Sequence, residues 1–139
     1  MQDILDRDDA WLEAVHDYIQ WLFPLPEPSP FNPAAPVLTV ADIAAFAADP
    51  SLRAALARME KFYGLGRADA PRPWLTPGNH NFRRLTRILR ALALLGLRAE
   101  AEALLARLEA LCSAPEAAAA VGRVTRGYWR DAVAGPLNR

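Results

Sequence analysis

Apolar residues recur every three or four positions along most of the chain, which is the spacing typical of amphipathic helices. The first such stretch runs from about Asp9 to Phe23 and predicts one helix. Its apolar arc consists of Trp11, Leu12, Val15, Tyr18, Ile19, Leu22 and Phe23, and the opposite side holds Glu13, Asp17 and Gln20. Pro24 is expected to end this helix, because proline disfavours helical geometry in the residue before it.

The same periodicity predicts five further helices. One begins at Thr39, a favourable N-cap, and carries an apolar stripe of Ile43, Phe46 and Ala47. The others are expected over residues 50–63, 81–95, 99–111 and 113–134. In the last helix, close packing is expected at Gly127, and apolar contacts are expected from Val121, Val124, Tyr128 and Trp129.

Two proline-rich segments, residues 24–36 and 67–79, separate these helices, and Trp74 is expected to anchor the second in the core. No stretch shows the alternation of a half-buried strand, and β-branched residues are scarce. The sequence therefore predicts an all-α fold, a compact single-domain bundle of five to six helices with two proline-rich loops. We expect one domain over residues 1–139, with its core at about 9–134.

Composition supports a folded domain and limits its partners. The chain has 139 residues, of which 53% are hydrophobic and 23% charged, so it can bury a core. Sixteen basic and sixteen acidic side chains cancel, which excludes a global charge for binding polyanions but not a local patch. Residues 1–52 hold nine acids and one base, whereas residues 53–98 hold two acids and ten bases. This asymmetry predicts internal charge matching, with the first helix packed beside the helix over residues 81–95.

The chain has one cysteine, Cys112, which excludes an intrachain disulfide and is expected to be a small buried side chain. With only two histidines as well, we expect no metal site and no cofactor. The acidic start has no apolar signal region, and no window approaches the roughly 18 apolar residues of a membrane span. We therefore expect a soluble, cytoplasmic protein.

Four blocks carry a resemblance to a known family. His16 to Pro28 reads HDYIQWLFPLPEP, and Leu38-Thr39 follows it; Met59 to Gly64 reads MEKFYG; Asn79 to Arg90 reads NHNFRRLTRILR, with LLGL at residues 94–97. In this order, over roughly residues 9–97, the blocks resemble the conserved region of the opioid growth factor receptor family.

The resemblance implies a receptor-like signalling module rather than an enzyme. It implies that related animal proteins bind the opioid peptide met-enkephalin and restrain cell proliferation at the nucleus. Those proteins carry extra sequence before this region and a long hydrophilic tail after it, whereas this chain is similar to a bacterial single-domain relative. The resemblance does not identify which residues of the shared domain touch a ligand.

Unusual polar residues gather at the edges of these blocks and form the candidate ligand-binding set: His16, Asp17, Gln20, Trp21, Asn79, His80, Asn81, Arg84 and Arg87. The hypothesis is an apolar groove with Asn, His and Arg at its edges, which binds an unknown peptide, small molecule or partner helix without catalysis. Structural roles are the alternative. The asparagines would cap a helix, the arginines would pair with acids, and Trp21 would be buried by a helix with two apolar sides.

Two other functions stay open at this stage. A small hydrolase or transferase would use His16, Asp17 and His80 for acid–base work near neutral pH. No nucleophile motif, phosphate loop or metal-ligand spacing accompanies them. A structural oligomerisation domain is the third possibility, and a nucleic-acid partner is not expected from a neutral chain without a reader motif.

Overall fold

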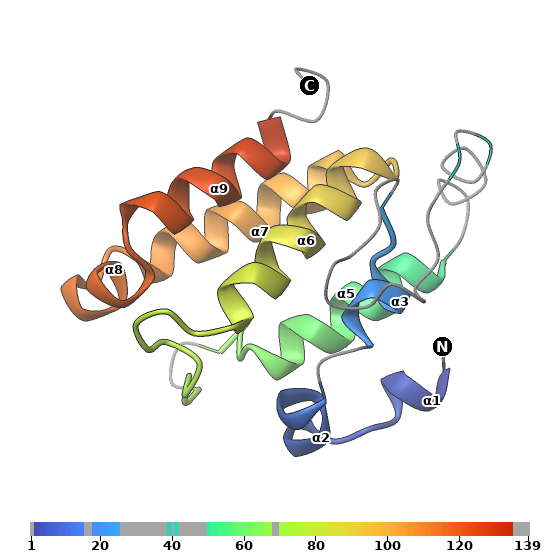
Figure 1. The fold of residues 1–139 in the computed structure, drawn as a ribbon, viewed down its shortest axis with the longest axis horizontal. Helices are drawn as coiled ribbons and strands as arrows, with labels where there is room; N and C mark the ends of the chain where they lie inside the picture. Colours follow the sequence, from blue (N-terminus) through green and yellow to red (C-terminus); the bar gives the residue numbers. More distant parts are fainter. Residues whose placement is uncertain are drawn as a thin grey trace. The chain divides into compact units, whose positions relative to one another are not determined.

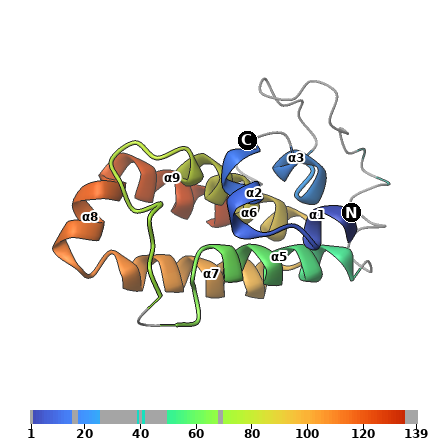
Figure 2. The same cartoon turned by 90° about the horizontal axis from the view of Figure 1, so that it is seen from below.

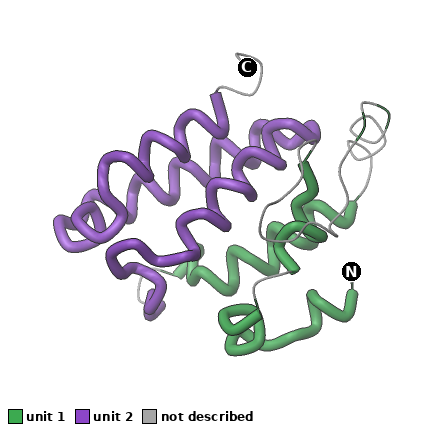
Figure 3. Tube along the Cα trace, viewed as in Figure 1, with its two compact units in different colours: residues 1–68 green, residues 69–139 purple. Residues whose placement is uncertain are grey.

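The computed structural model describes residues 2–15, 18–25, 39, 41, 50–67 and 70–134. Within these ranges it holds eight helices and no strand, which confirms the all-α prediction (Figure 1). The chain divides into two compact units, residues 1–68 and residues 69–139 (Figure 3). The expectation of a single domain stays a prediction.

The first unit contains four described helices: α1 (Gln2–Leu5), α2 (Asp9–Ala14), α3 (Ile19–Leu22) and α5 (Ser51–Phe62). Asp8 caps α2, because its carboxylate accepts a hydrogen bond of 2.9 Å from the amide of Trp11. Arg58 of α5 donates from Nη2 to the carbonyl of Arg7 and to Oδ1 of Asp9, both at 2.8 Å. This ion pair joins α2 to α5 within the first unit. The predicted packing of the first helix beside the helix over residues 81–95 stays a prediction.

The prediction of one continuous helix over residues 9–23 is wrong, because α2 ends at Ala14. Val15 is extended, with φ −95° and ψ 132°. In a longer helix the carbonyl of Leu12 would accept from the amide four residues later. Here it accepts a buried hydrogen bond of 2.7 Å from the Tyr18 hydroxyl, whose ring also packs on Trp11 with centroids 5.4 Å apart. A side-chain donor thus takes the backbone acceptor that a longer helix would use.

The second unit contains α6 (Asn81–Leu94), α7 (Arg98–Leu111), α8 (Pro115–Val121) and α9 (Arg123–Ala134). α6 packs against both α7 and α9, and α7 also packs against α9 (Figures 1 and 2). The observed bounds of α6 and α7 confirm the two predicted helices to within one residue. Trp129 is buried, and its indole Nε1 donates to the carbonyl of Phe82 at 3.2 Å, which fastens α9 to the first turn of α6.

The predicted helix over residues 113–134 is divided in two at Gly122, where φ is 83°. This left-handed conformation suits glycine, which has no Cβ. Beyond the break the helical phase starts anew, so Trp129, Ala132 and Val133 are buried while Val124 and Tyr128 are 68% and 59% exposed. Their predicted core positions are therefore wrong. The close packing expected at Gly127 does not occur within the described part of the chain, since no neighbouring atom there lies within 4 Å of a Cβ position on Gly127.

The described residues also test the predicted end of α5 and the predicted burial of Trp74. α5 ends before Gly64, whose φ of 66° confirms the predicted stop. Trp74 is buried with its ring edge-on to Phe82, which confirms it as a loop anchor. The stripe of Ile43, Phe46 and Ala47 and most of the first proline-rich segment lie outside the described residues. Among the described residues, no helix is long and apolar enough to cross a membrane.

The hydrogen bond that ends α2 can be tested with Tyr18→Phe. Removal of the hydroxyl leaves the buried Leu12 carbonyl without this donor, so the free energy of unfolding should fall by about 1–2 kcal/mol. Urea denaturation followed by circular dichroism measures the change. Tyr128→Phe removes the same atom from an exposed side chain and should change stability by less than about 0.5 kcal/mol. Equal effects of the two substitutions would contradict the role of the Tyr18 hydroxyl.

Candidate functional site

The structure divides the nine candidate residues between the two units. His16 and Asp17 lie outside the described residues, so their part in a site stays a prediction. Gln20 and Trp21 belong to the first unit, and the remaining five belong to the second: Asn79, His80, Asn81, Arg84 and Arg87. A shared groove between the two groups stays a prediction as well.

Gln20 and Trp21 are neighbours on α3, and the exposure of each side chain differs from what a continuous helix over residues 9–23 predicts. Gln20 was expected on the polar side of the helix but is only 5% exposed. Its Oε1 is buried and accepts no hydrogen bond from the part of the chain that the structure describes. Trp21 was expected to be buried but is 50% exposed, as its alternative as a surface anchor requires. Both differences follow from the break after Ala14, because the helical phase of α2 does not carry over to α3.

The asparagines before and at the start of α6 form a capping network, which confirms their structural interpretation. Nδ2 of Asn79 donates to the hydroxyl of Thr76 at 3.0 Å. Oδ1 of Asn79 accepts from both the backbone amide and the side-chain Nδ2 of Asn81, each at 2.9 Å. Asn79 thereby satisfies an amide that the first turn of α6 would otherwise leave without an acceptor.

Arg84 continues this network into the interior of the second unit. Its Nη1 donates to Oδ1 of Asn81 at 3.2 Å, and both residues are buried. A buried guanidinium needs such acceptors, because desolvation of a charge is costly. Asn81 and Arg84 are therefore held inside the fold rather than presented at the surface to a ligand.

His80, Arg83 and Arg87 make the polar arc of α6. Their spacings of three and four residues place them within about 60° of the helix circumference. His80 and Arg83 are exposed, and Arg87 is half-buried. α6 carries four arginines and no acidic residue, so the helix itself is positively charged. We call the surface formed by His80, Arg83 and Arg87 the α6 arc.

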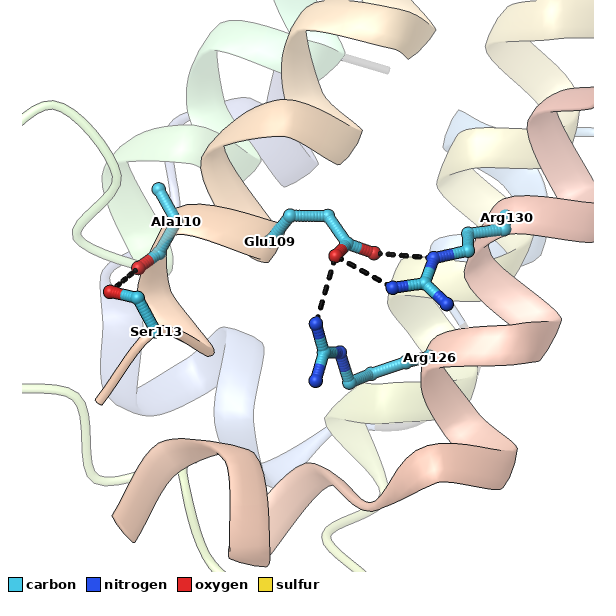
Figure 4. Close-up of polar contacts among 5 residues, drawn as sticks. All are labelled: Glu109, Ala110, Ser113, Arg126 and Arg130. Atoms are coloured by element: carbon cyan, nitrogen blue, oxygen red, sulfur yellow. Dashed lines mark hydrogen bonds and ion pairs between the residues drawn. The ribbon is translucent and has the colours of Figure 1, made fainter. Parts of the chain in front are cut away.

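An ion-pair cluster between α7 and α9 was not predicted. Glu109 accepts from Nε and Nη2 of Arg130 and from Nη2 of Arg126, each at 2.9 Å (Figure 4). The hydrogen bond from Arg130 is the main reason why the pKa of Glu109 lies below its ordinary value. The spacing of Arg126 and Arg130 shows that they share a helix face, but no local pattern shows that their acceptor is on another helix.

Cys112 behaves as the sequence predicts. It is buried, and its burial raises the pKa of the thiol. A thiol with a raised pKa is a poor nucleophile and metal ligand at neutral pH. Within the described ranges, no three side chains among His, Cys, Asp and Glu come close enough to hold a metal ion.

The capping role of Asn79 predicts a specific pair of substitutions. Asn79→Ala removes the acceptor of the Asn81 amide and should lower the free energy of unfolding by about 1 kcal/mol. Asn79→Asp keeps an oxygen at the same place and should retain most of the stability. Urea denaturation measures the free energy of unfolding of both variants and of the wild type. An equal loss of stability in both variants would argue against a capping role of Asn79.

The Glu109 cluster predicts a pH-dependent contribution to stability. Because the pKa of Glu109 is lowered by folding, its contribution is complete above the ordinary value of 4.5 and is lost as pH falls through the folded pKa. Glu109→Gln should therefore destabilise the protein near neutral pH and differ less from the wild type in acid. The melting temperatures of Glu109→Gln and the wild type, measured at neutral pH and at a pH below the folded pKa of Glu109, test this expectation. Glu102→Gln, an exposed change on the same helix, should have little effect at either pH.

Comparison with known proteins places the chain beside one family. A family model described as the opioid growth factor receptor conserved region matches residues 1–112. The opioid growth factor receptors of Mus musculus and Rattus norvegicus are each 40% identical to the chain over 114 residues, and that of Homo sapiens is 38% identical. These matches cover 70% of the chain but only 18%, 19% and 16% of the relatives, so the chain spans less than a fifth of their length. No solved structure matches it.

Proposed function

Because the chain belongs to the opioid growth factor receptor conserved-region family, we propose that it is a non-catalytic module that binds an acidic peptide or protein segment. The relatives are named receptors, and a receptor acts by binding a ligand. The matched region is a small part of those proteins, so the proposal concerns binding by this region only.

The α6 arc is the observation that carries the proposal. Its arginines lie on a helix without acidic residues, and Arg83 is exposed. A guanidinium presents a planar set of donors that fits a carboxylate with two parallel hydrogen bonds. Arg87 is half-buried, which restricts its side chain before a ligand arrives and reduces the entropy lost on binding. The chemistry of the arc thus favours a ligand with several carboxylates.

Trp21 offers a second type of contact, since half of its surface is exposed. Exposed tryptophans contribute strongly to binding energy where a partner covers them. It lies in the first unit and the α6 arc in the second, so we assign the two surfaces separately. The acidic ligand is assigned to the α6 arc alone.

The hydrolase or transferase alternative is not proposed. It requires His16, Asp17 and His80 to converge, and the first two lie outside the described residues. His80 is exposed at the start of α6, next to asparagines that cap the helix. Among the described residues, no three side chains of His, Cys, Asp or Glu gather into a metal site.

Arg87→Glu should abolish or strongly weaken acidic-peptide binding while the fold is retained. The probe is a fluorescein-labelled oligoglutamate peptide, and oligoglutamine of the same length is its uncharged control. Fluorescence anisotropy should show a loss of affinity of about tenfold or more, because a carboxylate then faces the ligand. The opioid growth factor after which the relatives are named is a further probe.

Arg107→Glu is the matched control, because it makes the same charge change at an exposed position on α7. Its affinity for oligoglutamate should stay close to that of the wild type. An equal loss in both variants would show that only net charge matters, and equal affinity for both peptides would contradict a carboxylate-binding arc.

A further inference from the structure

Besides its buried side, α9 has exposed apolar side chains on the side away from the core of the second unit. Val124 and Tyr128 are exposed, whereas Trp129, Ala132 and Val133 face inward. Gly127 lies between the two exposed residues in the sequence, and no neighbouring atom of the described residues comes within 4 Å of a Cβ position there. The backbone of α9 is therefore open to close approach at one point, with an apolar side chain on each side of it along the chain.

Charges of opposite sign lie at equal distances from this point. Arg123 is four residues before Gly127 and Asp131 is four residues after it, and both are exposed. The three residues lie in one row along the helix, within about 80° of its circumference. We call this row with Val124 and Tyr128 the α9 face.

The two charges are available to a partner. The other arginines of α9, Arg126 and Arg130, are held by Glu109. Arg123 and Asp131 form no ion pair within the part of the chain that the structure describes. The charges of the α9 face therefore differ from those of the Glu109 cluster, which are paired within the second unit.

We propose that the α9 face pairs with the same face of a second copy of this chain, with the two α9 helices antiparallel and crossing at Gly127. A twofold axis through that point brings together residues at equal distances from it. Arg123 then faces Asp131 of the partner subunit, and the symmetric pair forms on the other side. Val124 and Tyr128, which lie on one side of the row, pack beside the crossing and lose their exposure to water.

The charge pattern favours a second copy over another partner. The row has a cation at one end, glycine in the middle and an anion at the other end. When two copies of the row lie antiparallel, each cation therefore faces the anion of the other copy. A parallel arrangement would place Arg123 opposite Arg123 of the partner subunit, so like charges exclude it. The absence of a side chain at Gly127 allows the two backbones to approach closely. The interface is small, so we expect a weak dimer with a Kd on the order of micromolar or higher.

Sedimentation equilibrium of the full chain over a range of concentrations tests the proposal. The wild type should show a monomer–dimer equilibrium. Arg123→Asp and Asp131→Arg should each raise the Kd by about tenfold or more, because like charges then meet at both ends of the crossing. An equimolar mixture of the two variants should form a heterodimer, since opposite charges meet again. Arg107→Asp, on α7, is the matched control and should dimerise like the wild type.

Gly127→Leu separates the interface from the fold. A Cβ at this position meets no neighbouring atom of the described residues, and leucine improves helix propensity, so the monomer should stay folded. The same side chain blocks the close approach of two helices, and the dimer should be lost. A wild type that is monomeric at every concentration would overturn the proposal. So would charge variants and a Gly127→Leu variant that dimerise unchanged, since the dimer would then use another face.

Discussion

The hydrogen bond from the Trp129 indole to the Phe82 carbonyl determines which side of α9 faces the core of the second unit. With Trp129 turned inward, helical geometry carries Arg126 and Arg130 to the edge beside α7, where Glu109 accepts from both. The same rotation leaves Gly127 and Val124 on the outside. Arg98 adds a contact at the other end of α9, where it donates to the carbonyl of Val133. The cation near the helix C-terminus is favourable, and it helps to hold α9 in this rotation.

A similar division between interior and surface occurs on α6. Asn79 and Asn81 satisfy the start of the helix, and Arg84 is drawn inward to Asn81. Four arginines on one short helix would repel one another in a uniform arrangement. Arg84 is buried against an amide oxygen, whereas Arg83 and Arg87 belong to the α6 arc. The arginines of α6 therefore have different roles although the sequence does not distinguish them. The position of a hydrogen-bond acceptor, such as Oδ1 of Asn81, decides which arginine is held in the interior.

The sequence predicts α6 and α7 well because their limits depend on local signals. Apolar spacing marks the buried face, and Gly96 stops α6 with a φ of 93°. The breaks after Ala14 and at Gly122 were not predicted. The first depends on a hydroxyl reaching back six residues to the Leu12 carbonyl, and the second on a backbone conformation that glycine permits but does not require. Each break resets the helical phase, which explains why Gln20, Val124 and Tyr128 were placed on the wrong side. The sequence does not predict the Glu109 cluster, because Arg126 and Arg130 lie 17 and 21 residues away from Glu109 along the chain.

The zero net charge of the chain conceals two surfaces with different electrostatic character. The α6 arc holds two arginines on a helix without acidic residues, so two copies of it repel, and it suits a ligand that brings its own carboxylates. The α9 face holds one charge of each sign at equal distances from Gly127, so it attracts its own copy and has little attraction for an acidic ligand. The two proposed interactions therefore do not compete for one kind of partner. Each surface exists because an internal contact fixes its helix first: the Asn79 cap and the Arg84 bond on α6, and the Trp129 bond and the Glu109 cluster on α9.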